Sequence, residues 1–208
     1  MSLFLRHKEE GFLLGVWRMD ESFEELCRLL AGTDLCRQAD ERFRSPQRKQ
    51  EWLSVRLLLR NLAGADKEIA YLPSGKPYLA DGSFHISISH TRGYVALILG
   101  QASVGIDIEQ YAVRVRRVAS KFVRPDEQPA PYWGDDTWSL LLHWSAKEVM
   151  FKCMNSSEVD FCAHLQIFPF VPQERGEFHA REYRTEQQRE FLIRYLLHPD
   201  FVLTWTVD

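Results

Sequence analysis

The stretch Val104-Gly-Ile-Asp-Ile-Glu109 decides the interpretation of this chain. It is short, apolar and rich in β-branched side chains, which predicts a strand. Side chains at alternate positions of a strand share a face. Asp107 and Glu109 should therefore point the same way, with Ile106 and Ile108 on the opposite face, toward the core. An ordinary solvent-facing strand with two acids would read the same, so the motif needs a partner elsewhere in the chain.

A second motif, Trp144-Ser-Ala-Lys-Glu-Val-Met-Phe-Lys152, supplies that partner. Its spacing predicts a helix in which Glu148 and Lys152 lie one turn apart on a shared face. Alone, these two residues would form an ordinary surface ion pair. If the helix docks beside the strand, three carboxylates meet near a lysine. Such convergence implies a bound cation or a raised pKa on one acid, and Mg²⁺ prefers oxygen ligands of this kind.

Length and composition indicate a protein that can fold around a hydrophobic core without the help of cross-links. The chain has 208 residues, a hydrophobic content of 45% and a net charge of −3, which gives no general attraction to nucleic acid or anionic membranes. No apolar run approaches the ~20 residues of a membrane span, and no secretion signal is present. The cysteines form no C-x-x-C pair, so we expect reduced thiols and a cytoplasmic protein. They are Cys27, Cys36, Cys153 and Cys162.

Strands and long amphipathic helices follow one another in two similar series. We predict helices at 22–30, 47–62, 113–123 and 137–153, a mobile loop at 124–136, and strands at 12–19, 84–89, 94–99, 104–108, 165–171, 178–184, 191–197 and 201–207. The fold class is therefore α+β, with two pseudo-symmetric halves and antiparallel or mixed sheets. We expect the halves to be 1–100 and 101–208, with the metal site in the second half. They should form one compact unit with the active cleft between them.

Three further segments carry donors that suit an anionic ligand. They are Ser89, His90 and Thr91 at the end of the strand at 84–89, Lys76 in the turn at 72–77, and Arg48 and Lys49 at the start of the helix at 47–62. Each also has an ordinary explanation, as a turn or as a solvated charged helix end. The sequence has no H-E-x-x-H, G-x-S-x-G or G-x-G-x-x-G pattern, which argues against a zinc site, a hydrolase triad and a dinucleotide fold.

Taken in order, four segments resemble the 4′-phosphopantetheinyl transferases of the surfactin-synthetase-activating type. The segments are Gly75-Lys76-Pro77, Ser87-Ile88-Ser89-His90, Val104–Glu109 and Trp144–Lys152. The resemblance implies the fold of that family, with coenzyme A bound as co-substrate between the halves. It also implies transfer of the phosphopantetheine arm to a serine of an apo acyl or peptidyl carrier protein, leaving 3′,5′-ADP.

The resemblance also implies roles for individual residues. Asp107, Glu109 and Glu148 would bind Mg²⁺, or Mn²⁺ in its place, and Lys152 would assist the leaving group. Either Glu148 or a metal-bound water would deprotonate the incoming serine. The residues that would contact coenzyme A are His90 at the diphosphate, Lys76 at the adenosine 3′-phosphate, and Ser89, Thr91, Arg48 and Lys49 nearby.

We expect a monomer whose basic stretch steers an acidic carrier protein. That stretch comprises Arg114, Arg116, Arg117 and Lys121. The segment Cys153–Glu158 departs from the Gly-rich turn common in the family, which leaves an idle coenzyme A- or carrier-binding relative as one alternative. A Mg²⁺-dependent diphosphate hydrolase is the other, because it would share the acidic cluster.

Overall fold

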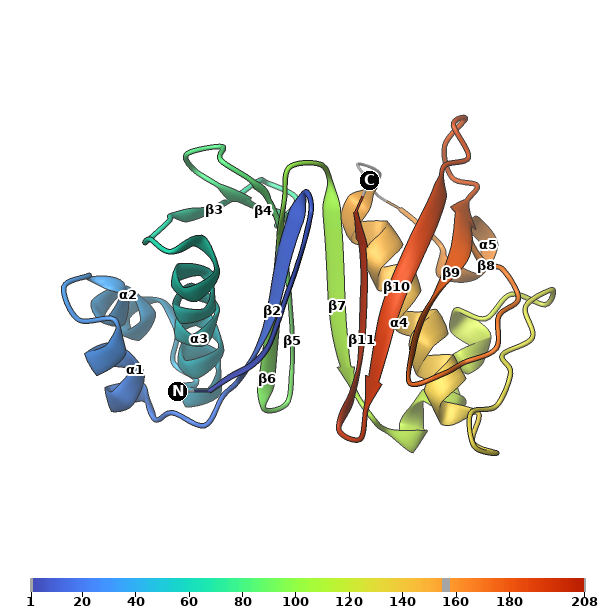
Figure 1. Ribbon diagram of the computed structural model, residues 1–208, viewed down its shortest axis with the longest axis horizontal. Helices are drawn as coiled ribbons and strands as arrows, with labels where there is room; N and C mark the ends of the chain where they lie inside the picture. Colours follow the sequence, from blue (N-terminus) through green and yellow to red (C-terminus); the bar gives the residue numbers. More distant parts are fainter. Residues whose placement is uncertain (1, 155–157, 208) are drawn as a thin grey trace. The chain divides into compact units, whose positions relative to one another are not determined.

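The computed structural model describes residues 2–154 and 158–207, and it forms two compact units, Met1–Ala102 and Ser103–Asp208. Each unit has its own sheet and its own long helix (Figure 1). All strand pairs are antiparallel. The predicted α+β class is confirmed, whereas the active cleft expected between the halves stays a prediction.

The first unit is a four-stranded sheet, in the order β1-β2-β6-β5, covered by helices. Helix α3 packs on β2 and β6, and α1 and α2 pack on α3 on its side away from the sheet (Figure 1). The elements are β1 (Leu3–Glu9), β2 (Phe12–Arg18), α1 (Phe23–Leu29), α2 (Leu35–Arg42), α3 (Pro46–Ala63), β3 (Ile69–Tyr71), β4 (Pro77–Leu79), β5 (His85–Thr91) and β6 (Tyr94–Gly100).

Local sequence explains why α3 begins and ends where it does. The Ser45 side chain caps the first turn, Pro46 occupies the position where a helix tolerates proline, and Gly64 ends the helix with a φ of 74°. The apolar stripe of the helix is buried, and Leu58 shares its cluster with Trp17 of β2. The N-terminal end of α3 therefore stays accessible while its middle is fixed against the sheet.

The second unit is a five-stranded sheet in the order β7-β11-β10-β9-β8, with helix α4 lying across β7 and β11. A nine-residue 3₁₀ helix, η1, packs against α4. The elements are β7 (Val104–Gln110), η1 (Val113–Lys121), α4 (Thr137–Cys153), α5 (Phe161–His164), β8 (Leu165–Ile167), β9 (Arg175–Glu182), β10 (Glu190–His198) and β11 (Phe201–Val207).

A glycine lets α4 approach β7 closely. A Cβ atom at Gly105 would lie 2.8 Å from the Val149 carbonyl oxygen and 2.8 Å from Cys153 Sγ. Any larger residue would therefore have to push the helix backbone away from the strand. Because Asp107 and Glu109 are on the same face of β7 as Gly105, the close approach brings helix side chains directly onto both acids.

Some local predictions were wrong. The short strands β3 and β4, the strand β1 and the polar helix α2 were not predicted, and β8 is shorter than the strand expected at 165–171. The cysteines were expected to be reduced, but Cys27 of α1 and Cys36 of α2 form a disulfide with Cα atoms 5.6 Å apart. A spacing of nine residues across two helices gives no recognisable pattern in the sequence. The departure from the family pattern expected at 153–158 lies partly outside the described residues.

Candidate functional site

The acids of β7 face helix α4, with Asp107 buried and Glu109 partly buried. Asp107 is 4% exposed, whereas Ile106 and Ile108 are buried on the opposite face of the strand. The ordinary explanation, a solvent-facing strand, therefore does not apply. Side chains of α4 lie over this face and form with it a polar layer inside the unit. We call this set the acidic layer; it consists of Asp107, Glu109, Trp144, Ser145, Glu148 and Lys152.

Asp107 is held at both of its oxygens. Lys152 Nζ donates to Oδ1 at 2.7 Å, and Ser145 Oγ donates to Oδ2 at 2.8 Å. Ser145 also shares a hydrogen bond of 2.6 Å with Thr204, which lies opposite Asp107 on β11. The ordinary alternative was a surface ion pair between Lys152 and Glu148, but the ion pair that Lys152 forms is with Asp107.

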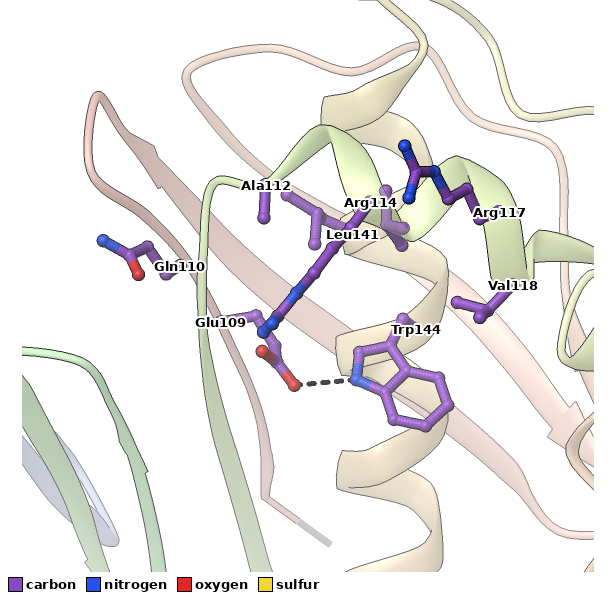
Figure 2. Close-up of a pocket in the computed structure, with 9 residues that line it drawn as sticks. Glu109, Gln110, Ala112, Arg114, Arg117, Val118, Leu141 and Trp144 are labelled. Carbon is purple, nitrogen blue, oxygen red and sulfur yellow. Dashed lines mark hydrogen bonds between the residues drawn. The ribbon is translucent and has the colours of Figure 1, made fainter.

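Glu109 is fixed by an aromatic side chain. Trp144 Nε1 donates to Glu109 Oε1 at 2.7 Å (Figure 2). The indole ring lies between Phe122 and Phe161, with ring centroids 5.4 and 5.5 Å away. Trp144 therefore also determines where the Glu109 carboxylate points.

A buried lysine holds the aromatic neighbours of Trp144 in place. Lys147 Nζ donates to the Phe122 carbonyl at 2.5 Å, to Glu127 at 2.9 Å and to the Phe161 carbonyl at 3.2 Å. Burial lowers the pKa of Lys147, and the facing carboxylate of Glu127 opposes that effect. Lys147 therefore serves structure, although it is adjacent in sequence to Glu148.

The environment of the acidic layer disfavours negative charge. Burial raises the pKa of Glu148 to about 7, with a further contribution from Asp107 and opposition from Lys152. Burial and Asp107 also raise the pKa of Glu109, against the hydrogen bond from Trp144. The three carboxyl groups thus influence one another, and a nearby cation would favour the ionised form of each.

The donor chemistry of the acidic layer suits a hard divalent ion, since Asp107, Glu109 and Glu148 offer only carboxylate oxygens. Within residues 2–154 and 158–207, however, no three His, Cys, Asp or Glu side chains are gathered as a ready metal-binding group. Asp107 and Glu109 instead accept hydrogen bonds from Lys152 and Trp144.

A pocket of about 400 Å³ adjoins Glu109 in the second unit. Its wall is mostly apolar, and two arginines of η1 line it (Figure 2). The Arg114 side chain extends toward Glu109, and its positive charge partly offsets the rise in the pKa of that acid. Arg117 also lines the pocket, while Arg116 is held by ion pairs of 2.8 and 2.5 Å to Asp135 and Asp136. The predicted basic stretch is therefore divided between two faces.

The first unit holds a second pocket, of about 220 Å³, and Arg48, Arg56 and His90 are among the residues that line it. Arg48 Nη1 lies 3.1 Å from His90 Nε2 and 2.9 Å from Glu51. Arg56, which the sequence analysis did not single out, also lines it: its guanidinium lies 3.4 Å from the centre of the Trp52 ring. Burial lowers the pKa of Arg56 to about 10. An arginine within the apolar stripe of the helix was the sequence signal that could have revealed it.

The other predicted coenzyme A contacts are distributed around this basic pocket. Lys76 lies between Gly75 and Pro77, which line the pocket. Ser89 and Thr91 alternate with His90 along β5 and so belong to the opposite face of the strand. Lys49 forms an ion pair of 2.5 Å with Asp40 of α2 and is not among the lining residues. The structure thus brings together Arg48 and His90.

The fold and the acidic layer define an α+β protein with carboxylates and a lysine between a strand and a helix. Residues 103–206, half of the chain, match the model of the ACPS family, described as the 4'-phosphopantetheinyl transferase superfamily, and the chain belongs to that family. It is also 28% identical over 141 residues to a protein of Synechocystis sp. strain PCC 6803 named "Putative 4'-phosphopantetheinyl transferase slr0495". That alignment covers 60% of this chain and 56% of the relative's length. No helix in the described part of the chain has both the length and the apolarity needed to cross a bilayer.

Proposed function

We propose that this protein transfers the 4′-phosphopantetheine arm of coenzyme A to a serine of an apo acyl or peptidyl carrier protein. The products are the holo carrier and 3′,5′-ADP. The observation that carries the proposal is the acidic layer, which lies inside the region that matches the transferase family. We further assign the chain to the surfactin-synthetase-activating type and expect a monomer, because one chain supplies two α+β units.

The proposed reaction joins the serine oxygen to the β-phosphorus of coenzyme A and breaks the bond to 3′,5′-ADP. Such a transfer needs charge neutralisation and in-line positioning more than covalent help. Asp107, Glu109 and Glu148 would hold Mg²⁺, which neutralises diphosphate charge when bound. Lys152 adds positive charge for the leaving oxygen. Glu148 would take the serine proton.

The basic pocket of the first unit would receive the phosphorylated adenosine end of coenzyme A. Arg48 and Arg56 offer guanidinium groups, which bind phosphate oxygens in a planar, two-pronged geometry. His90 lies beside Arg48, and Lys76 lies in the chain between Gly75 and Pro77, which line the pocket. We therefore add Arg56 to the predicted set. Lys49 is a weaker candidate, since Asp40 already neutralises it.

The pocket beside Glu109 would receive the carrier protein. An apolar wall with Arg114 and Arg117 on it suits a partner that has an apolar side chain flanked by acids. Arg116 contributes less, because Asp135 and Asp136 already neutralise its charge.

The direct test is mass spectrometry of an apo carrier incubated with the protein, coenzyme A and Mg²⁺. We expect the carrier to gain one phosphopantetheine group. Asp107→Asn should abolish the gain, whereas Glu186→Gln, an exposed acid in the same unit, should not affect it.

The same assay separates the alternatives. Consumption of coenzyme A without a carrier would indicate a diphosphate hydrolase. Binding of coenzyme A or carrier with no turnover, across a panel of acyl and peptidyl carriers, would indicate an idle relative. Full activity in Asp107→Asn would contradict the role of the acidic layer.

A further inference from the structure

Lys152 is bonded to Asp107 and not to Glu148. Its Nζ donates to Asp107 Oδ1 at 2.7 Å and to the Ile106 carbonyl oxygen at 2.9 Å. The other oxygen of the same carboxylate accepts from Ser145 at 2.8 Å. The Lys152 side chain is 26% exposed and that of Asp107 is 6% exposed, so the pair is embedded in the unit. Protein groups therefore engage both oxygens of Asp107.

The ammonium of Lys152 offsets charge in the acidic layer. Three carboxyl groups lie near one another there, and like charges repel more strongly away from bulk water. A divalent ion bound by Asp107 would lie close to the ammonium, and the two cations would repel each other. The ion and Lys152 must therefore compete for the same carboxylate.

We propose that Lys152 is an internal substitute for the divalent ion: it occupies Asp107 in the metal-free protein and releases it when the ion binds. This inference rests on the proposed function, because it takes Asp107 as a metal ligand. The bond to the Ile106 carbonyl gives Lys152 a second attachment to β7, so its ammonium stays beside the layer after release. It is then available to the diphosphate oxygens of the donor, which couples loading of the ion to binding of the donor.

The test measures Mn²⁺ binding to the full chain without coenzyme A, by electron paramagnetic resonance and by calorimetry. Lys152→Met and Lys152→Gln should bind Mn²⁺ at least about tenfold more tightly than the wild type, because a competing positive charge is gone. Lys8→Met removes an exposed lysine from β1 of the other unit and should leave the affinity unchanged. In EDTA, Lys152→Met should unfold at a lower temperature than the wild type. Mn²⁺ should raise the Tm of this variant by more than it raises the Tm of the wild type.

Each outcome bears on one of the two proposals. If the wild type binds Mn²⁺ and both Lys152 variants bind it equally or more weakly, Lys152 is no substitute, although the metal site stands. If Asp107→Asn binds Mn²⁺ as tightly as the wild type, Asp107 is no ligand, and the metal assignment in the proposed function fails as well. Tight binding by the Lys152 variants, with weak binding by the wild type, supports the inference.

Discussion

The two units are built in the same way, but the candidate site of the first unit is basic and that of the second is acidic. Both are antiparallel sheets under one long helix, and both have a strand glycine beneath that helix, Gly15 under α3 and Gly105 under α4. In the first unit the helix presents Arg48 and Arg56 to a pocket. In the second, α4 presents Glu148 to two strand acids. The same framework can thus serve an anion or a cation, depending on a few residues of the helix face.

The units also differ in how their charges are held. In the first, the Arg48 side chain is half exposed and its partner Glu51 is buried, so the cation remains accessible to a ligand. In the second, Asp107 is buried and Lys152 covers it. We infer that the first unit is prepared to bind an anion as it stands, whereas the second must exchange partners before it can act.

The largest expected effect tests this division of labour between the units. Asp107→Asn should lower kcat by about a thousandfold or more, with KM for coenzyme A nearly unchanged, because it removes charge needed at the reacting phosphorus. Arg48→Ala should instead raise KM for coenzyme A by about tenfold, with a small change in kcat, because it removes a charge-assisted hydrogen bond. Steady-state kinetics with coenzyme A as the varied substrate gives both numbers.

Matched controls for these two variants are Glu186→Gln and Arg184→Ala, both at exposed positions between β9 and β10. Neither should change kcat or KM by more than about twofold, as expected for surface positions. An increase in KM from Asp107→Asn together with a loss of kcat from Arg48→Ala would reverse the assignment of the two units.

The two strand glycines give the next largest effect. At Gly105 the obstacle to a Cβ atom includes the backbone oxygen of Val149, whereas at Gly15 it is mainly the flexible tips of Leu58 and Leu62. Gly105→Ala should therefore lower the free energy of unfolding by about 2–3 kcal/mol, and Gly15→Ala by about 1 kcal/mol. Urea unfolding followed by tryptophan fluorescence measures both.

Activity should separate the glycine variants further. Displacement of α4 in Gly105→Ala moves Lys152 and Glu148 relative to Asp107, so kcat should fall even where the protein is folded. Gly15→Ala should keep the wild-type kcat. Equal losses of activity in the two variants would mean that the close approach of α4 to β7 has no special role in the site.

The sequence was sufficient to predict the parts of the site that lie in strongly patterned segments. Alternation in 104–109 placed Asp107 and Glu109 on one face, and helical spacing placed Glu148 one turn from Lys152. It could not reveal that Lys152 pairs with Asp107, because that choice depends on how closely α4 packs on β7. The role of Gly105 in this packing depends on the same distance.

Other features were not predicted because they depend on contacts between segments that are distant in the sequence. Arg56 lies in the apolar stripe of α3, and the sequence alone gives no reason for an arginine there. In the structure its guanidinium stacks on the Trp52 ring. The disulfide between Cys27 and Cys36 depends on how α1 and α2 pack on α3. Short strands such as β3 and β4 are stabilised by pairing with each other, which neither strand's own sequence predicts.

A smaller effect concerns the two faces of the basic stretch in the second unit. The double variant Arg114→Gln/Arg117→Gln should lower kcat/KM for an acidic carrier by about tenfold at low salt and weaken its dependence on salt. Arg116→Gln should change it by less than about twofold, because Asp135 and Asp136 already neutralise Arg116. Initial rates across a salt series measure this, and equal effects from both variants would contradict the assigned docking face.

The smallest expected effect is on the acid stability of the second unit. His143 of α4 is 3% exposed, and its Nδ1 lies 2.7 Å from the Ser139 carbonyl oxygen. Burial lowers the pKa of His143, against that hydrogen bond, so the folded chain binds this proton less readily than the unfolded chain. Stability should therefore be complete above the unfolded-state pKa of about 6.5 and fall as the pH drops below it.

This contribution can reach at most about 1.4 kcal/mol per pH unit, and His143→Gln should remove it. Unfolding free energies measured between pH 7.5 and 5.5 should fall less steeply in the variant than in the wild type. The same substitution at His179, exposed on β9, controls for the loss of one histidine and should keep the wild-type slope. Helix α3 of the first unit contains no histidine, so the weaker dependence of unfolding free energy on pH should arise in the second unit. A slope unchanged by His143→Gln would mean that other groups set the acid sensitivity of this unit.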